Sequence, residues 1–446
     1  MTSSSHPSTI AASHRMLAQL SVAAILAAGA GAALAAGPWS PTHVLQGTFA
    51  ASSPPEAPLV AINALGDAVY VWNANGVART ADHAATGTWT PAKALPGGNT
   101  AAGPVAVAIG RGGLAAAAWT TVATRYEPSR LLVSLRPAGG VFMPAVEISP
   151  GTVAGAIKLG IDCAGNVTVL WSTSAGLSSS TLPGASVPKG ECNGTPGTGP
   201  WGPAAQISNA GVGAGLPDLV VNDAGAALAV WQEGAPGNPS SIAAAYRPAG
   251  GAWQAPSTIS APTARATWNP KPGLDALGGA TVGYLDGSSM VVVTRPASGP
   301  WQTPAIISDA QQVQYPALAV TDAGDVIAAW LSTDATSGTA VWQRQWHAGA
   351  WGPATRLSGR NDTPDWPSAA ASGDGSLAIV TWTDDTAQRA RASVLQAGAW
   401  KRQTLGPAYW GGTVSVAAGG GKAAAGWARA VRGNPNAAQL VGRATP

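Results

Sequence analysis

Residues 316–358 read PALAVTDAGDVIAAWLSTDATSGTAVWQRQWHAGAWGPATRLS, and this stretch decides the fold. It contains four short runs of small, β-branched or aromatic residues, at 316–320, 326–330, 339–344 and 351–358, with Gly and Asp between them. Runs of this length between turn residues predict strands that follow one another as an antiparallel meander. The apolar positions do not recur with a helical period, so we expect a four-stranded sheet and no long helix.

The same segment recurs eight times along the chain, about 50 residues apart. An aromatic residue begins the fourth run of every copy: Trp39, Trp89, Phe142, Trp201, Trp253, Trp301, Trp351 and Trp400. A second aromatic residue ends the second run: Trp72, Trp119, Trp171, Trp231, Tyr284, Trp330, Trp382 and Trp427. A period of this length indicates an architecture in which each copy is one supersecondary unit.

Glycine and proline mark the turns and the edge of each unit. The turn between the first two runs holds a glycine in all eight copies, where a tight hairpin needs a residue that tolerates positive φ. These glycines are Gly66, Gly112, Gly165, Gly225, Gly278, Gly324, Gly375 and Gly421. The fourth run carries proline in seven copies, which indicates an edge strand. We therefore expect the fourth strand outermost and the first strand, with its small residues, innermost.

Small innermost residues and tryptophans farther out describe a β-propeller blade. The chain begins with a lone fourth strand, Trp39–Leu45, and ends with strands one to three of a last unit, residues 413–443. These two fragments complete one blade and close the ring. We predict an all-β, eight-bladed β-propeller of four-stranded antiparallel blades, one domain over residues 36–446. A seven-bladed ring is the alternative.

Residues 1–35 have the features of an export signal. Arg15 is the only basic residue there, residues 17–35 are apolar and small, and Ala33-Leu34-Ala35 offers a cleavage site. An uncleaved membrane anchor is the alternative. No later stretch has the ~20 consecutive apolar residues of a membrane helix. We expect a secreted or periplasmic protein without a membrane span once the signal is removed.

Charge and cysteine content narrow the partners and the compartment. The net charge is +3, only 10% of residues are charged, and Lys and Arg do not cluster, which argues against a nucleic-acid partner. Two cysteines in an exported chain most simply form one bridge. We expect a disulfide within the third blade, between Cys163 in its first turn and Cys192 in the long insertion at residues 182–199.

The repeat G-x-W-x-x-P…I-S…P-x-x-A-V-x-x-x-G…A-V-W resembles those of exported bacterial β-propeller repeat proteins, over residues 37–446. The resemblance implies the fold only. Sialidases share the architecture, but their S-x-D-x-G-x-x-W box is not reproduced, because Gly375 comes one place early in Ser372-Gly-Asp374-Gly375. Propeller lectins also have short Trp-rich blades. Their binding motifs do not occur here, so that comparison is one of architecture.

The chain offers little catalytic or metal-binding chemistry. His43, His83 and His347 lie in different units, and no His or Cys spacing matches a zinc site. Gly419-Gly420-Gly421 lies between two strands and not before a helix, so it does not predict a phosphate site. No serine has a convincing histidine partner. We expect no cofactor, no metal site and no catalytic residue, with a structural calcium along the channel as an alternative.

Arginine precedes proline in the third run of three copies, at Arg136, Arg247 and Arg295. Arginines gathered around one site could hold a carboxylate ligand. Equivalent positions on different blades point apart, however, so we interpret these arginines as decoration of the outer faces of the blades.

Four aromatic residues outside the two ladders come just before the first strands of blades five to eight. They are Trp268, Tyr315, Trp366 and Trp410. Acidic residues follow the second strands, and strand direction predicts them on the same face of the ring; they are Glu233, Asp286, Asp384 and Asp385. Aromatic rings beside carboxylates could hold a sugar or a peptide at the channel mouth. Alternatively, the aromatic residues plug the channel and the acids cap turns.

We interpret the chain as an exported, non-enzymatic binding or scaffold propeller, monomeric, with a glycan or a protein as ligand. A glycoside hydrolase or lyase that uses carboxylates on the channel-mouth face is the alternative, and it conflicts with the shortage of titratable residues. A purely structural surface protein is a third possibility.

Overall fold

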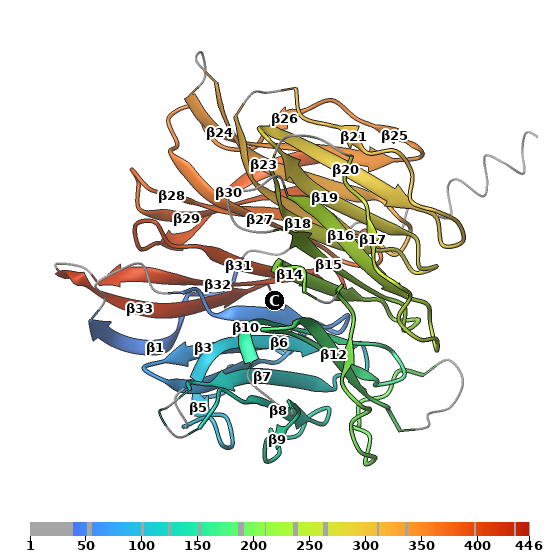
Figure 1. Ribbon diagram of the computed structural model, residues 1–446. Coiled ribbons are helices and arrows are strands. Elements are labelled where there is room, and N and C mark those ends of the chain that lie inside the picture. Colours follow the sequence, from blue (N-terminus) through green and yellow to red (C-terminus); the bar gives the residue numbers. More distant parts are fainter. Residues whose placement is uncertain are drawn as a thin grey trace, which may run out of the picture.

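The computed structural model is a ring of eight β-sheets, one per repeat (Figure 1). It describes residues 39–445 except 51–55, 100–101, 124, 126, 150–152, 186–190, 210, 235–239, 262–265, 310–311, 335–337, 397 and 432–433. The predicted export signal lies outside the described residues. Within them the strands pair antiparallel and no helix occurs, so no helix there could cross a membrane. The prediction of eight four-stranded blades is confirmed.

The first four blades are consecutive in the chain and each runs from the innermost strand outward. Blade 1 consists of β2 (Leu59–Ile62), β3 (Ala68–Ala74), β4 (Val77–His83) and β5 (Lys93–Ala94). Blade 2 consists of β6 (Ala102–Ile109), β7 (Ala115–Thr121), β8 (Leu131–Arg136) and β9 (Val146–Glu147). Blade 3 consists of β10 (Val153–Ile161), β11 (Val167–Thr173), β12 (Gly176–Leu182) and β13 (Ala205–Gln206). Blade 4 consists of β14 (Ala214–Val221), β15 (Ala227–Glu233), β16 (Ser241–Arg247) and β17 (Ser257–Thr258).

Blades 5 to 7 continue in the same order, and blade 8 joins the two ends of the chain. Blade 5 consists of β18 (Thr267–Leu274), β19 (Ala280–Asp286), β20 (Ser289–Arg295) and β21 (Ala305–Ile306). Blade 6 consists of β22 (Val313–Val320), β23 (Val326–Asp334), β24 (Gly338–His347) and two short outer pieces, β25 (Ala350–Trp351) and β26 (Thr355–Arg356). Blade 7 consists of β27 (Pro364–Ala371), β28 (Ala378–Asp384), β29 (Arg389–Gln396) and β30 (Ala399–Pro407). Blade 8 consists of β31 (Val414–Gly419), β32 (Lys422–Val431), β33 (Asn434–Ala444) and β1 (His43–Ala50).

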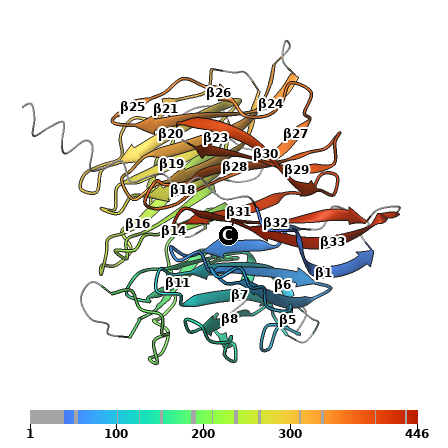
Figure 2. The same ribbon diagram turned by 180° about the vertical axis from the view of Figure 1, so that it is seen from behind.

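Ring closure follows the sequence prediction. β1 is the outer strand of blade 8 and pairs with β33, with Val44 opposite Val441 and Gln46 opposite Leu440. In both views the blue β1 lies beside the red β33 (Figures 1 and 2). The strand begins at His43 rather than at Trp39, but the Trp39 indole still reaches the neighbouring blade and donates to Gln403 Oε1 at 2.6 Å.

The second aromatic ladder forms the core between blades. Its seven tryptophans and Tyr284 are at most 2% exposed. Each lies on the second strand of its blade and packs among aliphatic side chains of the neighbouring blade; Trp382, for example, belongs to the same cluster as Ala317 and Ile327 of blade 6. Burying aromatic rings of this size contributes much of the favourable free energy of a sheet-on-sheet interface.

The first-turn glycines adopt positive φ in seven of the predicted positions, and blade 2 is the exception. There Gly113, not Gly112, takes the positive φ, of 88°. A Cβ at Gly112 would instead lie 2.5 Å from the carbonyl oxygen of Cys192. Gly112 is therefore required by the close approach of the blade 3 insertion, and the turn prediction was wrong by one residue in this blade.

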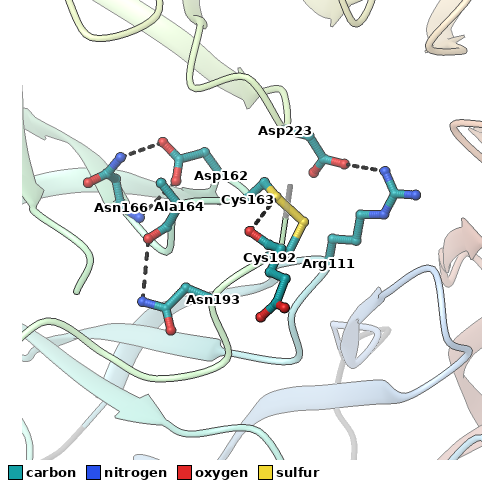
Figure 3. The surroundings of a disulfide bond; sticks show 9 residues. Arg111, Asp162, Cys163, Ala164, Asn166, Cys192, Asn193 and Asp223 are labelled. Carbon is teal, nitrogen blue, oxygen red and sulfur yellow. Dashed lines mark hydrogen bonds and ion pairs between the residues drawn. A yellow bond between two sulfur atoms is a disulfide. The ribbon is translucent and has the colours of Figure 1, made fainter. Parts of the chain in front are cut away.

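The predicted disulfide between Cys163 and Cys192 is present, with the two Cα atoms 4.4 Å apart (Figure 3). Cys163 lies in the first turn of blade 3, where its N–H donates to the Asp223 carbonyl of blade 4 at 3.0 Å. The Asn193 N–H donates to the Cys163 carbonyl at 2.7 Å, and Asn193 Nδ2 reaches the Ala164 carbonyl at 3.4 Å. The bridge and these bonds hold the insertion against blades 2 and 3.

The interpretation of Arg136, Arg247 and Arg295 as outer decoration is wrong. Arg136 and Arg247 are 8% exposed and each extends from its own third strand to the preceding blade. Arg136 Nη1 lies 2.5 Å from Asp82 Oδ1 of blade 1, and Arg295 lies over the Tyr246 ring of blade 4 at 4.1 Å. Blades pack face to face, so a long side chain from one face necessarily meets the neighbour.

Candidate functional site

A cavity of about 820 Å³ occupies the centre of the ring, lined by the innermost strand of every blade. Its wall combines aliphatic side chains such as Val60 and Leu318 with polar ones such as Asn73 and the carboxylate of Glu56. Two features interrupt that wall. One is a pair of aromatic rings from blades 6 and 7, and the other is a group of charged side chains from blades 3 to 5.

The aromatic feature is Tyr315 packed on Trp366, with ring centroids 4.0 Å apart and planes inclined by 36°. Each residue directly precedes a proline and has φ of +48°. At the same point the pairing with the second strand of the blade is irregular. The register shifts between Gln314 and Ala317 in β22 and between Asp365 and Ser368 in β27. A bulky residue in left-handed backbone costs about 1–3 kcal/mol, and such strain concentrates at functional sites.

The charged feature is Asp218 between Lys158 and Lys271. Lys158 Nζ lies 3.0 Å from Asp218 Oδ1, and Lys271 Nζ lies 3.9 Å from Oδ2. All three occupy the same position of the innermost strand, on β10, β14 and β18. Each pairs with the residue just before the buried aromatic residue of the second strand. Burial by itself would raise the pKa of Asp218, but the two lysines outweigh it and lower that pKa. Burial lowers the pKa of Lys271, an effect that Asp218 opposes.

The equivalent position on the other five innermost strands is uncharged. Its residues are Leu59, Ala106, Ala317, Ser368 and Ser415. The charged group therefore covers one side of the ring with a net charge of +1, and the Tyr315–Trp366 pair lines the other side. Sequence reasoning missed these charges, although an alignment of the repeats on their first-strand prolines brings Asp218 and Lys271 into one column.

One carboxylate, Asp365, adjoins Trp366 in the chain, and a second, Asp385, lies close enough to Asp365 for its charge to act on it. Asp365 Oδ1 accepts a hydrogen bond from the Trp366 N–H at 2.9 Å, and Asp385 Oδ1 accepts one from the Gly411 N–H at 3.2 Å. Burial raises the pKa of Asp365, and the charge of Asp385 adds to this effect. Burial also raises the pKa of Asp385, and Asp384 adds to it. Both groups hold their protons more readily than ordinary aspartates do.

The structure does not bring the four predicted aromatic residues together. Trp268 lies within β18, opposite Leu285 of β19. It is half-buried and packs against the core between blades 5 and 6. Trp410 is 61% exposed and lines a separate hollow with Tyr409 and Arg389, between blades 7 and 8. Only Tyr315 and Trp366 line the central cavity.

Three of the four predicted acidic residues, Glu233, Asp286 and Asp384, are the last residues of second strands, and Asp385 directly follows one, as the sequence predicted. Asp384 is 2% exposed and binds Arg391 of its own blade, Nη2 to Oδ2 at 2.9 Å. Glu233 accepts a hydrogen bond from Asn209 Nδ2 at 3.2 Å. Asp286 pairs with Ser289 in the hairpin of β19 and β20. None of the three lines the central cavity. Among the described residues, no three His, Cys, Asp or Glu side chains gather as a metal-binding group.

Comparison with known proteins supports the fold. No family model matches the chain, and no curated protein does. Among solved structures, the BP39L lectin from Burkholderia pseudomallei superposes with a TM-score of 0.52 at 15% identity, over 80% of this chain and 100% of the lectin. A polysaccharide lyase described as an ulvan lyase gives 0.49 at 10% identity, over 82% and 98%. A six-bladed fucose-binding lectin from Aleuria aurantia gives 0.40 at 14%, over 68% and 95%. At 15% identity the likeness to the BP39L lectin supports the fold and says nothing about a ligand of this chain.

Proposed function

We propose that this protein is a non-enzymatic, carbohydrate-binding β-propeller whose ligand site is the central cavity. The observation that carries the proposal is the Tyr315–Trp366 pair at the end of the cavity where the innermost strands begin. The Trp366 side chain remains 38% exposed although it is packed on Tyr315, so an aromatic face is available to a ligand.

The surrounding chemistry fits a sugar. A pyranose presents apolar C–H faces that pack on aromatic rings, and hydroxyl groups that need fixed donors and acceptors. Lys158 and Lys271 supply donors across the cavity, and Asp218 supplies an acceptor. A cavity of about 820 Å³ falls within the usual range of ~300–1,000 Å³ for small-ligand sites.

Two further points support an exported binding protein. A disulfide persists in oxidising compartments, and Cys163–Cys192 is such a bridge. The structural likeness to a lectin agrees with a glycan ligand by analogy of architecture. We therefore place the protein in the periplasm or outside the cell, as a monomer after removal of residues 1–35. A protein ligand at the same cavity is the alternative within this class.

The test is binding of the purified chain, residues 36–446, to a glycan array, followed by calorimetry with the strongest ligand. Trp366→Ala and Tyr315→Ala are each expected to weaken binding at least tenfold. Trp410→Ala is the matched control, because Trp410 is exposed but lines a different hollow. A ligand whose affinity responds to Trp410→Ala and not to Trp366→Ala would place the site elsewhere.

A second candidate, a glycoside hydrolase or lyase, is favoured by one observation. Asp365, next to Trp366, and Asp385, whose charge acts on Asp365, both have raised pKa values, which suits one of them to act as a general acid. The discriminating assay is release of reducing ends, or of unsaturated products, from the polysaccharide that the array identifies. Turnover that disappears in Asp365→Asn would make the protein an enzyme, whereas binding without turnover supports the non-enzymatic proposal.

A further inference from the structure

Three inter-blade arginines share one register position, and blade 6 has tryptophan there. Arg136, Arg247 and Arg295 each pair with the first residue of strand two in their blade, Ala115, Ala227 and Ala280. In blade 6 that partner is Val326, and the residue opposite it is Trp346.

The blade 3–blade 4 interface shows how such an arginine is held. Arg247 Nη1 donates to Thr181 Oγ1 at 2.7 Å and Nη2 donates to Thr168 Oγ1 at 2.9 Å. The guanidinium also lies over the Trp253 ring, 5.3 Å from its centroid. Burial lowers the pKa of Arg247, and the Asp162 carboxylate in the first turn of blade 3 opposes that fall. Two hydroxyls, one indole face and one carboxylate therefore form the guanidinium slot.

All four groups recur between blades 5 and 6. Thr281 pairs with Thr294 as Thr168 pairs with Thr181. Asp275 is the first-turn aspartate of blade 5 and accepts the Gly279 N–H at 2.7 Å, as Asp162 accepts the Asn166 N–H at 2.8 Å.

Trp351 is the counterpart of Trp253. In each blade the next residue donates its N–H to the same position of the third strand, the residue just before Trp346 or Arg247. Gly352 donates to the Gln345 carbonyl and Gln254 to the Tyr246 carbonyl, both at 2.8 Å. The slot at blades 5 and 6 thus has every element except its arginine.

A hollow of about 410 Å³ lies where the missing side chain would be, lined by Asp275, Thr281, Thr294, Trp346 and Trp351. Trp346 meets Trp351 edge to face, with centroids 5.6 Å apart, and does not fill the space. Arg295 also lines the hollow, but its guanidinium is stacked over Tyr246 of blade 4.

We propose that this hollow binds a guanidinium group from outside the chain. The planar cation would donate to Thr281 and Thr294, stack on Trp351 and face Asp275, as Arg247 does two blades earlier. A guanidinium suits this site better than an ammonium because its fork reaches two acceptors at once and its plane stacks on an indole. The group can come from a small guanidinium compound or from an arginine side chain of a peptide, and the site itself is independent of the central cavity.

The experiment measures binding of N-acetyl-L-arginine amide and N-acetyl-L-lysine amide by calorimetry and by the indole N–H signals of ¹⁵N-tryptophan-labelled protein. We expect at least a tenfold preference for the arginine probe, with shifts at Trp346 and Trp351 and none at Trp366. Agmatine and the peptide acetyl-Gly-Gly-Arg-Gly-Gly-amide then separate the two sources. Tighter binding of the peptide assigns the hollow to an arginine of a protein partner, and tighter binding of agmatine assigns it to a small molecule.

Two variants complete the test. Trp346→Arg should refill the slot from within, abolish binding of the arginine probe and raise the melting temperature by about 1–3 °C. Thr294→Val keeps the shape, removes one acceptor and should weaken binding about tenfold. Equal affinity for the two amides, undiminished binding in both variants, or occupation of the hollow by a neutral hexose instead of the arginine probe would overturn the proposal.

Discussion

Tyr315 and Trp366 belong to neighbouring blades, yet their rings pack at 4.0 Å, and each is placed by the same backbone device. In both, a residue with φ of +48° precedes the proline of the innermost strand and turns its side chain out of the strand register. Leu216 and Asn269 adopt the same conformation in blades 4 and 5, with φ of 48° and 56°, but carry no aromatic ring. Blades 4 to 7 therefore share this backbone conformation before the proline, and only blades 6 and 7 place an aromatic ring there.

Replacement of Trp366 by alanine should cost little stability. The side chain is 38% exposed and loses mainly its contact with Tyr315, so we expect a loss of about 1 kcal/mol. Trp330→Ala, in the buried ladder, should cost about 3–5 kcal/mol. Urea denaturation of both variants measures the difference. A cost for Trp366→Ala as large as that for Trp330→Ala would mean that the pair is a structural plug.

Asp218→Asn should destabilise the ring by about 1–3 kcal/mol at pH 7, because Lys158 and Lys271 lose their shared counter-charge. The pKa of Asp218 is lowered in the folded state, so its contribution is present above the unfolded value of about 4 and is lost as the pH falls through the folded value. The difference in stability between wild type and variant should therefore shrink as the pH falls below about 4. Asp309→Asn, at an exposed site, is the control.

Removal of the N-terminal strand should lower the melting temperature markedly. A chain that begins at residue 51 lacks β1, leaves β33 as an unpaired edge and removes the Trp39–Gln403 bond. A chain that begins at residue 36, which keeps β1, is the control. Equal melting temperatures for the two chains would show that β1 is dispensable for closure.

Loss of the Cys163–Cys192 bridge should cost about 3.6 kcal/mol, the value that loop-closure entropy gives for a sequence separation of 29 residues. The double variant Cys163→Ser/Cys192→Ser is compared with wild type by thermal denaturation, and thiol titration under denaturing conditions confirms the bridge in wild type. Because the bridge holds one insertion on blades 2 and 3, glycan binding should be unchanged. Reactive thiols in oxidised wild-type protein would contradict the assignment.

The repeat made the fold predictable. Strand number, strand order and closure by the two ends follow from the spacing of Trp72 and its counterparts and from prolines that can lie only at an edge. Such patterns reflect the local geometry within one blade, and the sequence shows them in eight copies. Contacts between blades leave no such recurring pattern in the sequence. The partner of Arg247 is a pair of threonines on another blade, and no single repeat reveals them.

The candidate site was predictable only in part for the same reason. Trp268, Tyr315 and Trp366 lie near the start of their first strands and Trp410 just before its own, but one residue of offset decides where a side chain points. Tyr315 and Trp366 directly precede proline and face the cavity, whereas Trp268 is one place earlier and packs into the blade. The close contact of Cys192 with Gly112 likewise depends on the path of the insertion at residues 182–199, which is not part of the repeat.

Ring closure in blade 8 also sets the order of assembly. Among the described strands β1 comes first in the chain and its partner β33 comes last, so their pairing has the longest sequence separation of the strand pairs there. Blades 1 to 7 are local meanders that can form as each segment becomes available, whereas the ring cannot shut until the final strand arrives. A stalled or truncated chain would thus hold assembled blades with an open seam and two unpaired strand edges.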